Sequence, residues 1–414
     1  MSILILNRIG LRALPYHLYL EDVAQKEAVL LTDVGKVPTG ELEAYRKLYR
    51  EVVELEGYES AGLMELTAEA LHRRHSFTKI VAISEFDLIR AGRLRDRWKI
   101  QGQGYDSAIA FRDKLVMKQF AERGDIKVPA SRRVDTAVDI LEFVEQHGYP
   151  AVVKPILGSG AVTTHIVRDD TDLRRVLATD VVRAELPASF EIEQFVSGRM
   201  YHVDGILSDG RPVVCWPSTY VNECHNFASG KALGSYQLEA ANPLSGRLNA
   251  FAHKLLRALP TPRDGAFHIE AFHTPGDELV LCEVTSRVGG PRIPDAHEVG
   301  FGLHLVRALV RALAGVPLDL PPSKRLEAPH RLGGFLLIPA RSGTLIKAPT
   351  CCSLPGVLDF QMLQEPGSQG TDAVEPTDFV ATFVFEAACE SDMRARIDAA
   401  TTWFEQNASW ERNA

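Results

Sequence analysis

The stretch from Gly265 to Gly290, GAFHIEAFHTPGDELVLCEVTSRVGG, constrains the fold more than any other part of the chain. It contains two runs of alternating apolar and polar residues separated by a short Thr-Pro-Gly-Asp break, and this pattern predicts a β-hairpin. Because side chains alternate between the two faces of a strand, His268 and Glu270 share one face of the first strand. The corresponding face of the second strand carries Glu283, Thr285 and Arg287.

If these two faces coincide, two carboxylates lie near each other across the hairpin, where like charges repel. A bound divalent cation is the usual remedy, and carboxylates that bridge to substrate phosphates suit Mg²⁺. The alternative is a pair of solvated glutamates on an exposed face. Arg287 and the two glycines after it favour a site, because they place an anion-binding group and a close backbone approach beside the carboxylates.

These residues resemble the metal-binding end of the ATP-grasp superfamily, in which a glutamate is followed by a Glu-x-Asn-x-Arg segment. Here the matching residues are Glu270 and then Glu283-Val-Thr-Ser-Arg287. The resemblance implies that the two glutamates hold Mg²⁺, or Mn²⁺, and that Arg287 is catalytic. Thr285 stands at the Asn position and is a weaker metal ligand, so a second metal would depend on water or substrate oxygens. Weaker candidates for substrate contacts are His268, Gly289 and Gly290.

Two lysines earlier in the chain are candidates for phosphate binding. Lys114 lies in the first turn of a predicted helix, where a cation opposes the helix dipole unless an anion is its partner. Lys154 ends the apolar strand YPAVVKP and needs a counter-ion once buried. The loop that follows offers backbone N–H groups to a phosphate through Gly158, Ser159 and Gly160. A solvated lysine is the local alternative, but both lysines and the loop resemble the phosphate-binding elements of ATP-grasp enzymes, where Lys154 would also be catalytic.

The segment EIEQFVSGRMYHVDGIL is expected to bind the nucleoside. In ATP-grasp proteins a matching segment links the two lobes, and its backbone pairs with adenine. The matching residues here are Glu193, Gln194, Phe195 and Val196. A glutamate that commonly holds the ribose is replaced by Met200, so His202 or Asp204 on the same strand face is expected to take its place. A satisfied, half-buried histidine is the alternative for His202.

Residues 222–237, NECHNFASGKALGSYQ, are too polar and glycine-rich for a core strand, and we interpret them as a loop over the site. His225 and Lys231 are its chemically capable members and are candidates for substrate or phosphate contacts. After Gly290 the pattern predicts a turn and then one amphipathic helix.

The order of strands and helices predicts a chain that combines α/β and α+β parts. Alternating strands and helices over residues 1–110 predict a parallel sheet. The resemblance implies that this part is a Rossmann-like pre-ATP-grasp domain. The resemblance then implies a two-lobed ATP-grasp core. Its small lobe, with the lysines and the glycine-rich loop, is assigned to residues 111–187 and its large lobe to residues 188–325. Residues 326–414 are expected to form a small α+β lid with little chemistry of its own.

Charge and composition narrow the classes of partner. A net charge of −8 without a basic block argues against nucleic acid, and no run approaches the length of a membrane span. Six cysteines without CxxC or framework spacing favour reduced thiols and a cytoplasmic protein. A homodimer is an open expectation.

The resemblance implies an ATP-dependent ligase that joins a carboxylate, an amino acid or a small acid like one, to an amine. The reaction would pass through an acyl phosphate and release ADP and phosphate. FRDK followed by EVTSRVGG most resembles the L-amino-acid (dipeptide) ligase branch. One alternative is a biotin-carboxylase or purine-type enzyme that activates bicarbonate or formate, although Gly289-Gly290 replaces the Glu-His segment of biotin carboxylases. Another is a non-catalytic nucleotide-binding regulatory protein.

Overall fold

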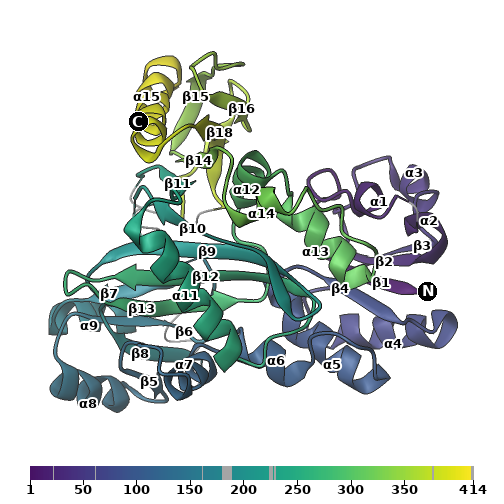
Figure 1. The fold of residues 1–414 in the computed structure, drawn as a ribbon, viewed down its shortest axis with the longest axis horizontal. Helices are drawn as coiled ribbons and strands as arrows, with labels where there is room; N and C mark the ends of the chain where they lie inside the picture. Colours follow the sequence, from purple (N-terminus) through teal and green to yellow (C-terminus); the bar gives the residue numbers. More distant parts are fainter. Residues whose placement is uncertain are drawn as a thin grey trace.

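The computed structural model describes most of the chain, and its elements are arranged around one large sheet (Figure 1). The described residues are 1–21, 23–60, 62–160, 162–179, 189–222, 227, 230–374 and 377–411. No helix within these ranges is long and apolar enough to span a membrane.

The N-terminal part is built on a parallel sheet of order β3-β2-β1-β4, as the sequence predicts. Its strands are apolar on both faces because helices cover both: Ile3 and Ile5 belong to one buried cluster, Leu4 and Leu6 to another. The elements are β1 Ile3–Asn7, α1 Tyr16–Tyr19, α2 Ala24–Glu27, β2 Ala28–Asp33, α3 Leu42–Arg46, β3 Glu51–Leu55, α4 Leu63–His75, β4 Lys79–Ala82, the 3₁₀ turn η1 Glu85–Asp87, α5 Leu88–Trp98 and α6 Tyr105–Ala110.

A second sheet of four antiparallel strands, in the order β5-β8-β6-β7, forms a separate lobe at the lower left of Figure 1. Its elements, with the helix that precedes them, are α7 Lys114–Arg123, β5 Ser131–Val134, α8 Ala137–His147, β6 Ala151–Pro155, β7 His165–Val167, α9 Asp170–Leu177 and β8 Phe190–Gln194. Strand β8 pairs with β5 and β6, so the expected boundary between residues 187 and 188 falls on the wrong side of this strand. The division into four domains otherwise stays a prediction.

The large sheet has the order β13-β12-β9-β10-β11-β14-β18-β16, and a three-stranded sheet, β17-β15-β19, lies beyond it. The remaining elements are β9 Arg199–Ser208, β10 Arg211–Tyr220, β11 Leu233–Gln237, α11 Pro243–Ala258, β12 Gly265–His273, β13 Leu279–Thr285, α12 Ile293–Phe301, α13 Leu305–Ala314, α14 Lys324–Glu327, β14 Leu332–Pro339, β15 Gly343–Lys347, β16 Val357–Met362, β17 Gln369–Gly370, β18 Phe379–Ala387, α15 Glu390–Asn407 and β19 Ser409–Glu411.

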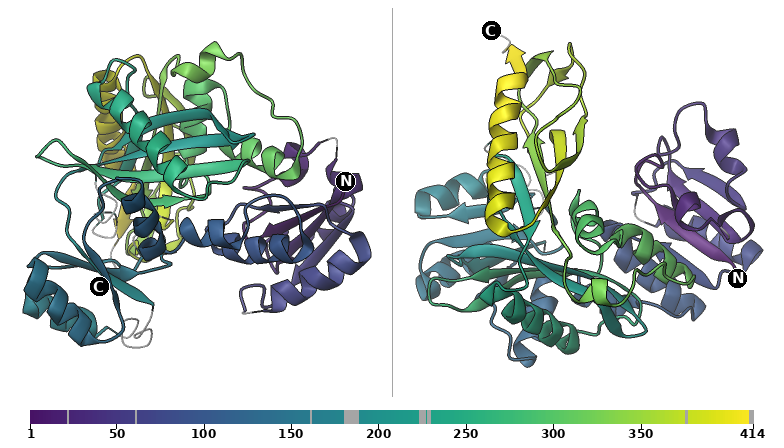
Figure 2. Two further views of the ribbon diagram at one scale, coloured as in Figure 1. Left: turned by 60° about the horizontal axis from the view of Figure 1, so that its bottom comes forward. Right: turned by 45° about the horizontal axis from the view of Figure 1, so that its top comes forward.

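Two of our expectations for this region are wrong. Residues 233–237, expected in a loop, form the fully buried strand β11, which pairs with β10 and β14. Two helices follow Gly290 instead of one, because the left-handed Gly302 (φ 70°) ends α12 before α13 begins. The expected C-terminal lid stays a prediction; its strands β14, β18 and β16 extend the large sheet, and the yellow helix α15 lies along the C-terminal strands (Figure 2).

Alternation along β9 and β12 divides the large sheet into a core face and a site face. Val203 and Ile269 pack with the apolar side of α11 in one buried cluster. Residues one position along each strand, His202 and Glu270, therefore point to the opposite face. That opposite face is where the candidate site lies.

Candidate active site

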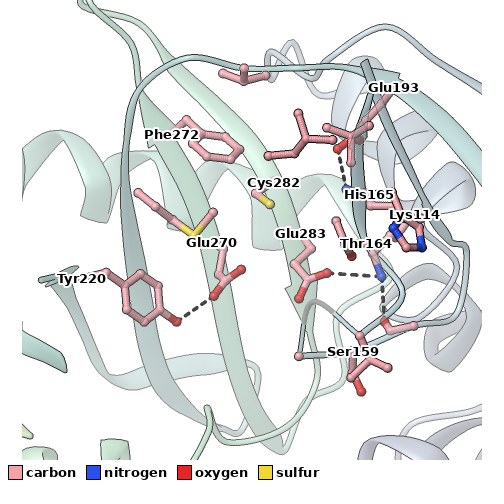
Figure 3. A pocket seen from close by; sticks show the side chains of 18 of the residues that line it. Lys114, Ser159, Thr164, His165, Glu193, Tyr220, Glu270, Phe272, Cys282 and Glu283 are labelled. Carbon is pink, nitrogen blue, oxygen red and sulfur yellow. Dashed lines mark hydrogen bonds and ion pairs between the residues drawn. The ribbon is translucent and has the colours of Figure 1, made fainter. Parts of the chain in front are cut away.

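A cavity of about 560 Å³ lies between the β5–β8 lobe and the site face of the large sheet (Figure 3). Its volume falls within the usual range for small-molecule sites. The β5–β8 lobe contributes strands β6 and β7 and the loop between them. The large sheet contributes β12 and β13 at one end and β10, β11 and β14 at the other.

The two predicted carboxylates meet across the hairpin. β12 and β13 pair antiparallel with Glu270 directly opposite Glu283, so both side chains enter the cavity. A bulge at this point adds Cys282 to the cavity wall next to Glu283. The Tyr220 hydroxyl donates a hydrogen bond to Glu270 Oε1 at 2.7 Å (Figure 3).

Lys114 supplies the positive charge nearest to this pair. It stands at the start of α7, which Asp113 caps by accepting from two backbone N–H groups. The Lys114 ammonium lies 3.3 Å from Glu283 Oε2 and donates to the Gly158 carbonyl at 2.7 Å. Burial alone would raise the pKa of Glu283, but Lys114, Lys154 and Arg287 together outweigh it and the pKa is lowered. Glu283 is therefore ionised at neutral pH.

Lys154 is buried on β6 within a compact set of alternating charges. Its ammonium lies 2.5 Å from Glu193 Oε1 and 3.8 Å from Glu191 Oε1, and Lys118 binds both of these carboxylates. Burial alone would disfavour the charged forms of Glu193 and Lys154. The lysines nevertheless lower the pKa of Glu193 to about 2, and the carboxylates raise the pKa of Lys154. We missed Lys118 and Glu191. The available signals were helical spacing from Lys114 and strand spacing from Glu193.

The predicted nucleoside segment lies beside the cavity, but its residues differ in their access. Glu193, Phe195 and Val196 line the cavity, whereas Gln194 does not. The backbone N–H of Gln194 donates to Ala130 O at 3.0 Å, and that of Phe195 donates to Pro150 O at 3.2 Å. These two N–H groups are therefore already bonded within the protein. The predicted phosphate loop is better placed, since Gly158, Ser159 and Gly160 all line the cavity.

Arg287 lines the cavity just beyond β13 and is anchored from the N-terminal part of the chain. Its Nε donates to Glu85 Oε2 at 2.7 Å, and its Nη1 donates to Val288 O at 2.8 Å. Glu85 is buried and also pairs with Arg112. Burial raises the pKa of Glu85, but the two arginines lower it below its ordinary value. No local pattern in the sequence points to Glu85, because its role depends on packing between distant segments.

Two histidines and an aspartate form a buried network beneath the cavity. Asp204 accepts from His202 Nδ1 at 2.5 Å and from His268 Nδ1 at 2.8 Å. The network continues from His202 to Ser235 Oγ at 2.5 Å, and His268 Nε2 lies 3.4 Å from Glu270 Oε1. The three side chains are close enough to share a metal ion, but hydrogen bonds already link them to one another.

This placement does not support ribose binding by His202 or Asp204. Both side chains are fully buried and neither lines the cavity, so neither is placed to contact a nucleotide bound there. His268 does line the cavity, as does Met200. The alternative of a satisfied histidine describes His202 better than a ligand contact does.

The two glycines after Arg287 have different surroundings. A Cβ at Gly289 would lie 2.6 Å from Asp204 Oδ1 and 2.8 Å from His268 Nδ1, which is too close for any side chain. Gly289 is therefore required by the buried network and does not itself line the cavity, whereas Gly290 does. The expected close backbone approach exists, but at Gly289 it is made to the network and not to a substrate.

Three further candidates are not brought to the cavity. Thr285 lies opposite His268 with its hydroxyl buried and unpartnered in the described structure, and it is not part of the cavity lining. Lys231 is exposed and borders a separate hollow beside α15. His225 lies outside the described residues.

The network predicts a pH dependence of stability. Burial would lower the pKa of His268, but Asp204 raises it from an ordinary value of 6.5 to about 10. The folded state therefore keeps a proton that the unfolded state loses. The contribution of His268 to stability is complete below pH 6.5 and is lost as the pH rises through about 10. Without nucleotide or divalent cation, the melting temperature of the wild type should fall more between pH 7 and pH 10 than that of His268→Gln.

His273→Gln is the matched control for that experiment. His273 ends the same strand, and its partner Asp277 is largely exposed. This variant should keep the wild-type dependence on pH. Equal falls in His268→Gln and the wild type would contradict the assigned charge of His268.

Comparison with known proteins adds sequence relatives. Residues 113–204 match the family model for the carbamoyl-phosphate synthase L chain, ATP binding domain. The chain is 26% identical over 298 residues to an L-arginine-specific L-amino acid ligase of Bacillus subtilis, and the match covers 70% of each chain.

Solved structures resemble the whole chain. An L-amino acid ligase from Bacillus licheniformis superposes with a TM-score of 0.74 at 14% identity, covering 100% of this chain and 99% of that one. A carboxyaminoimidazole ribonucleotide synthase from Aspergillus clavatus, complexed with ATP, superposes with a TM-score of 0.70 at 14% identity, covering 98% and 99%. At these identities the likeness establishes the fold.

Proposed function

We propose that this chain, which has the ATP-grasp fold and resembles the L-amino-acid ligases, joins a carboxylate to an amine and converts ATP to ADP and phosphate. The observation that carries the proposal is the set of charged groups around one cavity. Two facing carboxylates, Glu270 and Glu283, lie beside Lys114, Lys154 and Arg287. Groups that bind cations, phosphates and a carboxylate are therefore within reach of one bound substrate.

The phosphates of ATP would lie at the end of the cavity formed by the β5–β8 lobe. Lys114 and Lys154 pair with carboxylates there, and each is buried. An ammonium with a buried counter-ion stays protonated, and Lys154 keeps a raised pKa. The loop at Gly158–Gly160 lines the same cavity as both lysines, with Gly158 O bonded to Lys114, and would offer backbone N–H groups to the same phosphates.

The residues present fit a divalent cation at Glu270 and Glu283. Their donor set consists of two carboxylates in direct register, which is the oxygen chemistry that Mg²⁺ and Mn²⁺ prefer. Thr285 is not expected to bind the cation, since its side chain is buried and does not line the cavity. When bound, the cation would neutralise charge on the phosphates.

The chemistry needs a leaving group on the acyl carbon, because a carboxylate is a poor electrophile. A carboxylate oxygen would attack the terminal phosphorus, with ADP as the leaving group, and the amine would then displace phosphate from the acyl phosphate with loss of a proton. Arg287 is fixed by Glu85 and faces the cavity. It would orient the acid and stabilise the tetrahedral oxyanion through its planar donors.

Phosphate release on a matrix of amino acids, supplied singly and in pairs with Mg²⁺ and ATP, tests this function. We expect release with pairs and formation of ADP but not AMP. With the acid alone, hydroxylamine should trap a hydroxamate from the acyl phosphate. An empty trap during ligation, with AMP as the product, would instead mean adenylation.

The same matrix separates the alternative functions. Release that requires bicarbonate or formate would favour the carboxylase or purine-type reaction, whose enzymes share this fold. No release with any substrate, together with measurable ATP binding, would favour a nucleotide-binding regulatory protein. Either outcome would contradict the ligase.

A further inference from the structure

The cavity continues beyond the two carboxylates along one face of the large sheet. In the strand register, Glu270 lies opposite His202, and His202 lies opposite Ser218. Tyr220 is two residues further along the same strand as Ser218, so it belongs to the same face. Its hydroxyl, 2.7 Å from Glu270, links the carboxylate end of the cavity to the strands that follow.

Those next strands carry apolar side chains on this face. Tyr220 of β10 lies opposite Ser235 of β11, which lies opposite Phe335 of β14. Leu233, two residues before Ser235, lies opposite Leu337. Tyr220, Leu233, Phe335 and Leu337 all line the cavity. Within a few strand spacings of about 4.8 Å, the face thus changes from carboxylates to apolar groups.

Ile293, at the start of α12, adds a fifth apolar side chain to this end of the cavity. We call these five residues the apolar wall: Tyr220, Leu233, Ile293, Phe335 and Leu337. All five belong to one buried cluster, so the wall is held by packing behind it. It is a formed surface and not a gap between loose side chains.

The charged groups of the cavity lie elsewhere. Among the described lining residues, one charged set surrounds the facing carboxylates and another lies on β7 and α9, and the apolar wall contains neither. A charged side chain buried against the wall would lose its hydration without gaining a partner. An apolar side chain would instead be removed from water there, which favours binding.

We propose that the apolar wall binds the side chain of a substrate, and that at least one of the joined molecules is an amino acid with a large apolar side chain, such as leucine, methionine or phenylalanine. This inference rests on the proposed function and assigns the substrate class of the same site. The geometry supports it because Tyr220, which begins the wall, bonds to Glu270, and Arg287 lines the same cavity, so a carboxylate bound by Arg287 would share the cavity with the wall. The substrate side chain then extends away from the charged groups.

Binding and turnover of leucine and asparagine, which have similar shape but different polarity, give the sharpest comparison. Binding is measured by calorimetry with Mg²⁺ and a non-hydrolysable ATP analogue, and turnover by phosphate release with ATP. We expect leucine to bind at least about tenfold more tightly than asparagine, the scale at which pockets discriminate small changes in a side chain. Arginine and glutamate should bind more weakly still.

Variants of Leu233 then test the wall itself. Leu233→Asp should weaken the binding of leucine and strengthen the binding of arginine, so that the order of their affinities is reversed. The same substitution at Leu363, an exposed leucine outside the cavity, should leave the order unchanged. Because a buried aspartate can prevent folding, Leu233→Ala is the second variant. It should keep the fold and shift the preference from leucine towards phenylalanine, since the smaller side chain enlarges the space beside the wall.

The outcomes separate this inference from the ligase reaction. Tight leucine binding without phosphate release would support the wall and contradict the ligase. Phosphate release with arginine or glutamate but not with apolar amino acids would support the ligase and overturn the wall. The inference also fails if none of the amino acids binds, or if Leu233→Ala leaves the order of preference unchanged.

Discussion

Glu283→Gln is expected to lower kcat for phosphate release by about two decades or more, the scale on which one electrostatic group contributes to catalysis. The glutamine keeps the size of the side chain but leaves Glu270 as the remaining carboxylate of the facing pair. The fold should persist, because Lys114 retains its hydrogen bond to Gly158 O. Turnover is measured at saturating ATP and Mg²⁺, with thermal melting as the check of folding.

Glu278→Gln is the matched control on the same hairpin. Glu278 is half-exposed, pairs with Lys127 at 2.5 Å and lies outside the cavity, so its replacement should leave turnover unchanged. Near-wild-type turnover in Glu283→Gln would show that the facing carboxylates do not hold the cation. Loss of turnover in both variants would point to the stability of the hairpin instead.

Arg287→Lys is expected to retain ATP binding and to lose about two decades in kcat. A lysine has a single donor centre, whereas the guanidinium donates to Glu85 through Nε and to Val288 O through Nη1, and Arg287 also lines the cavity. A lysine cannot keep these contacts and also present a fork of donors to a tetrahedral oxyanion. The measurements are kcat for phosphate release and the dissociation constant of ATP.

Two further variants make this result interpretable. Arg247→Lys changes an arginine that pairs with Asp277 at the surface, and it should leave both kcat and the dissociation constant of ATP unchanged. Glu85→Gln leaves Arg287 in place with a weaker anchor, so it should lower kcat by less than Arg287→Lys. Unchanged kcat in Arg287→Lys would contradict the role of Arg287 in stabilising the oxyanion. Loss of ATP binding would instead indicate that Arg287 binds the nucleotide.

The hairpin shows how much of the site local patterns can predict. Period-two alternation gives the face of each side chain without reference to the rest of the molecule, and the short connection limits the register. These rules gave the face of Glu270 on its strand and of Glu283 on its own, and the structure shows that the two faces coincide. The parallel N-terminal sheet followed in the same way from strands that alternate with helices.

Strand β11 shows where such rules fail. The residues LGSYQ look too polar and small for a buried strand, so we assigned them to a loop. Two of their side chains bond to distant partners: Ser235 hydrogen-bonds His202, and the side-chain oxygen of Gln237 accepts from the Gly333 N–H at 2.9 Å. A polarity pattern cannot include partners that lie far away in the sequence.

The sequence by itself determined the elements whose signals are local: the hairpin, the strand face of each of its carboxylates, the two lysines and the glycine-rich loop. Tertiary structure alone decided which charges meet. It paired Lys154 with Glu193, anchored Arg287 on Glu85, buried His202 with Asp204, and brought β14 to the cavity as part of the apolar wall. The physical reason is that propensity and alternation act over a few residues, whereas the free energy of a buried charge or an apolar surface depends on which distant segments exclude water from it.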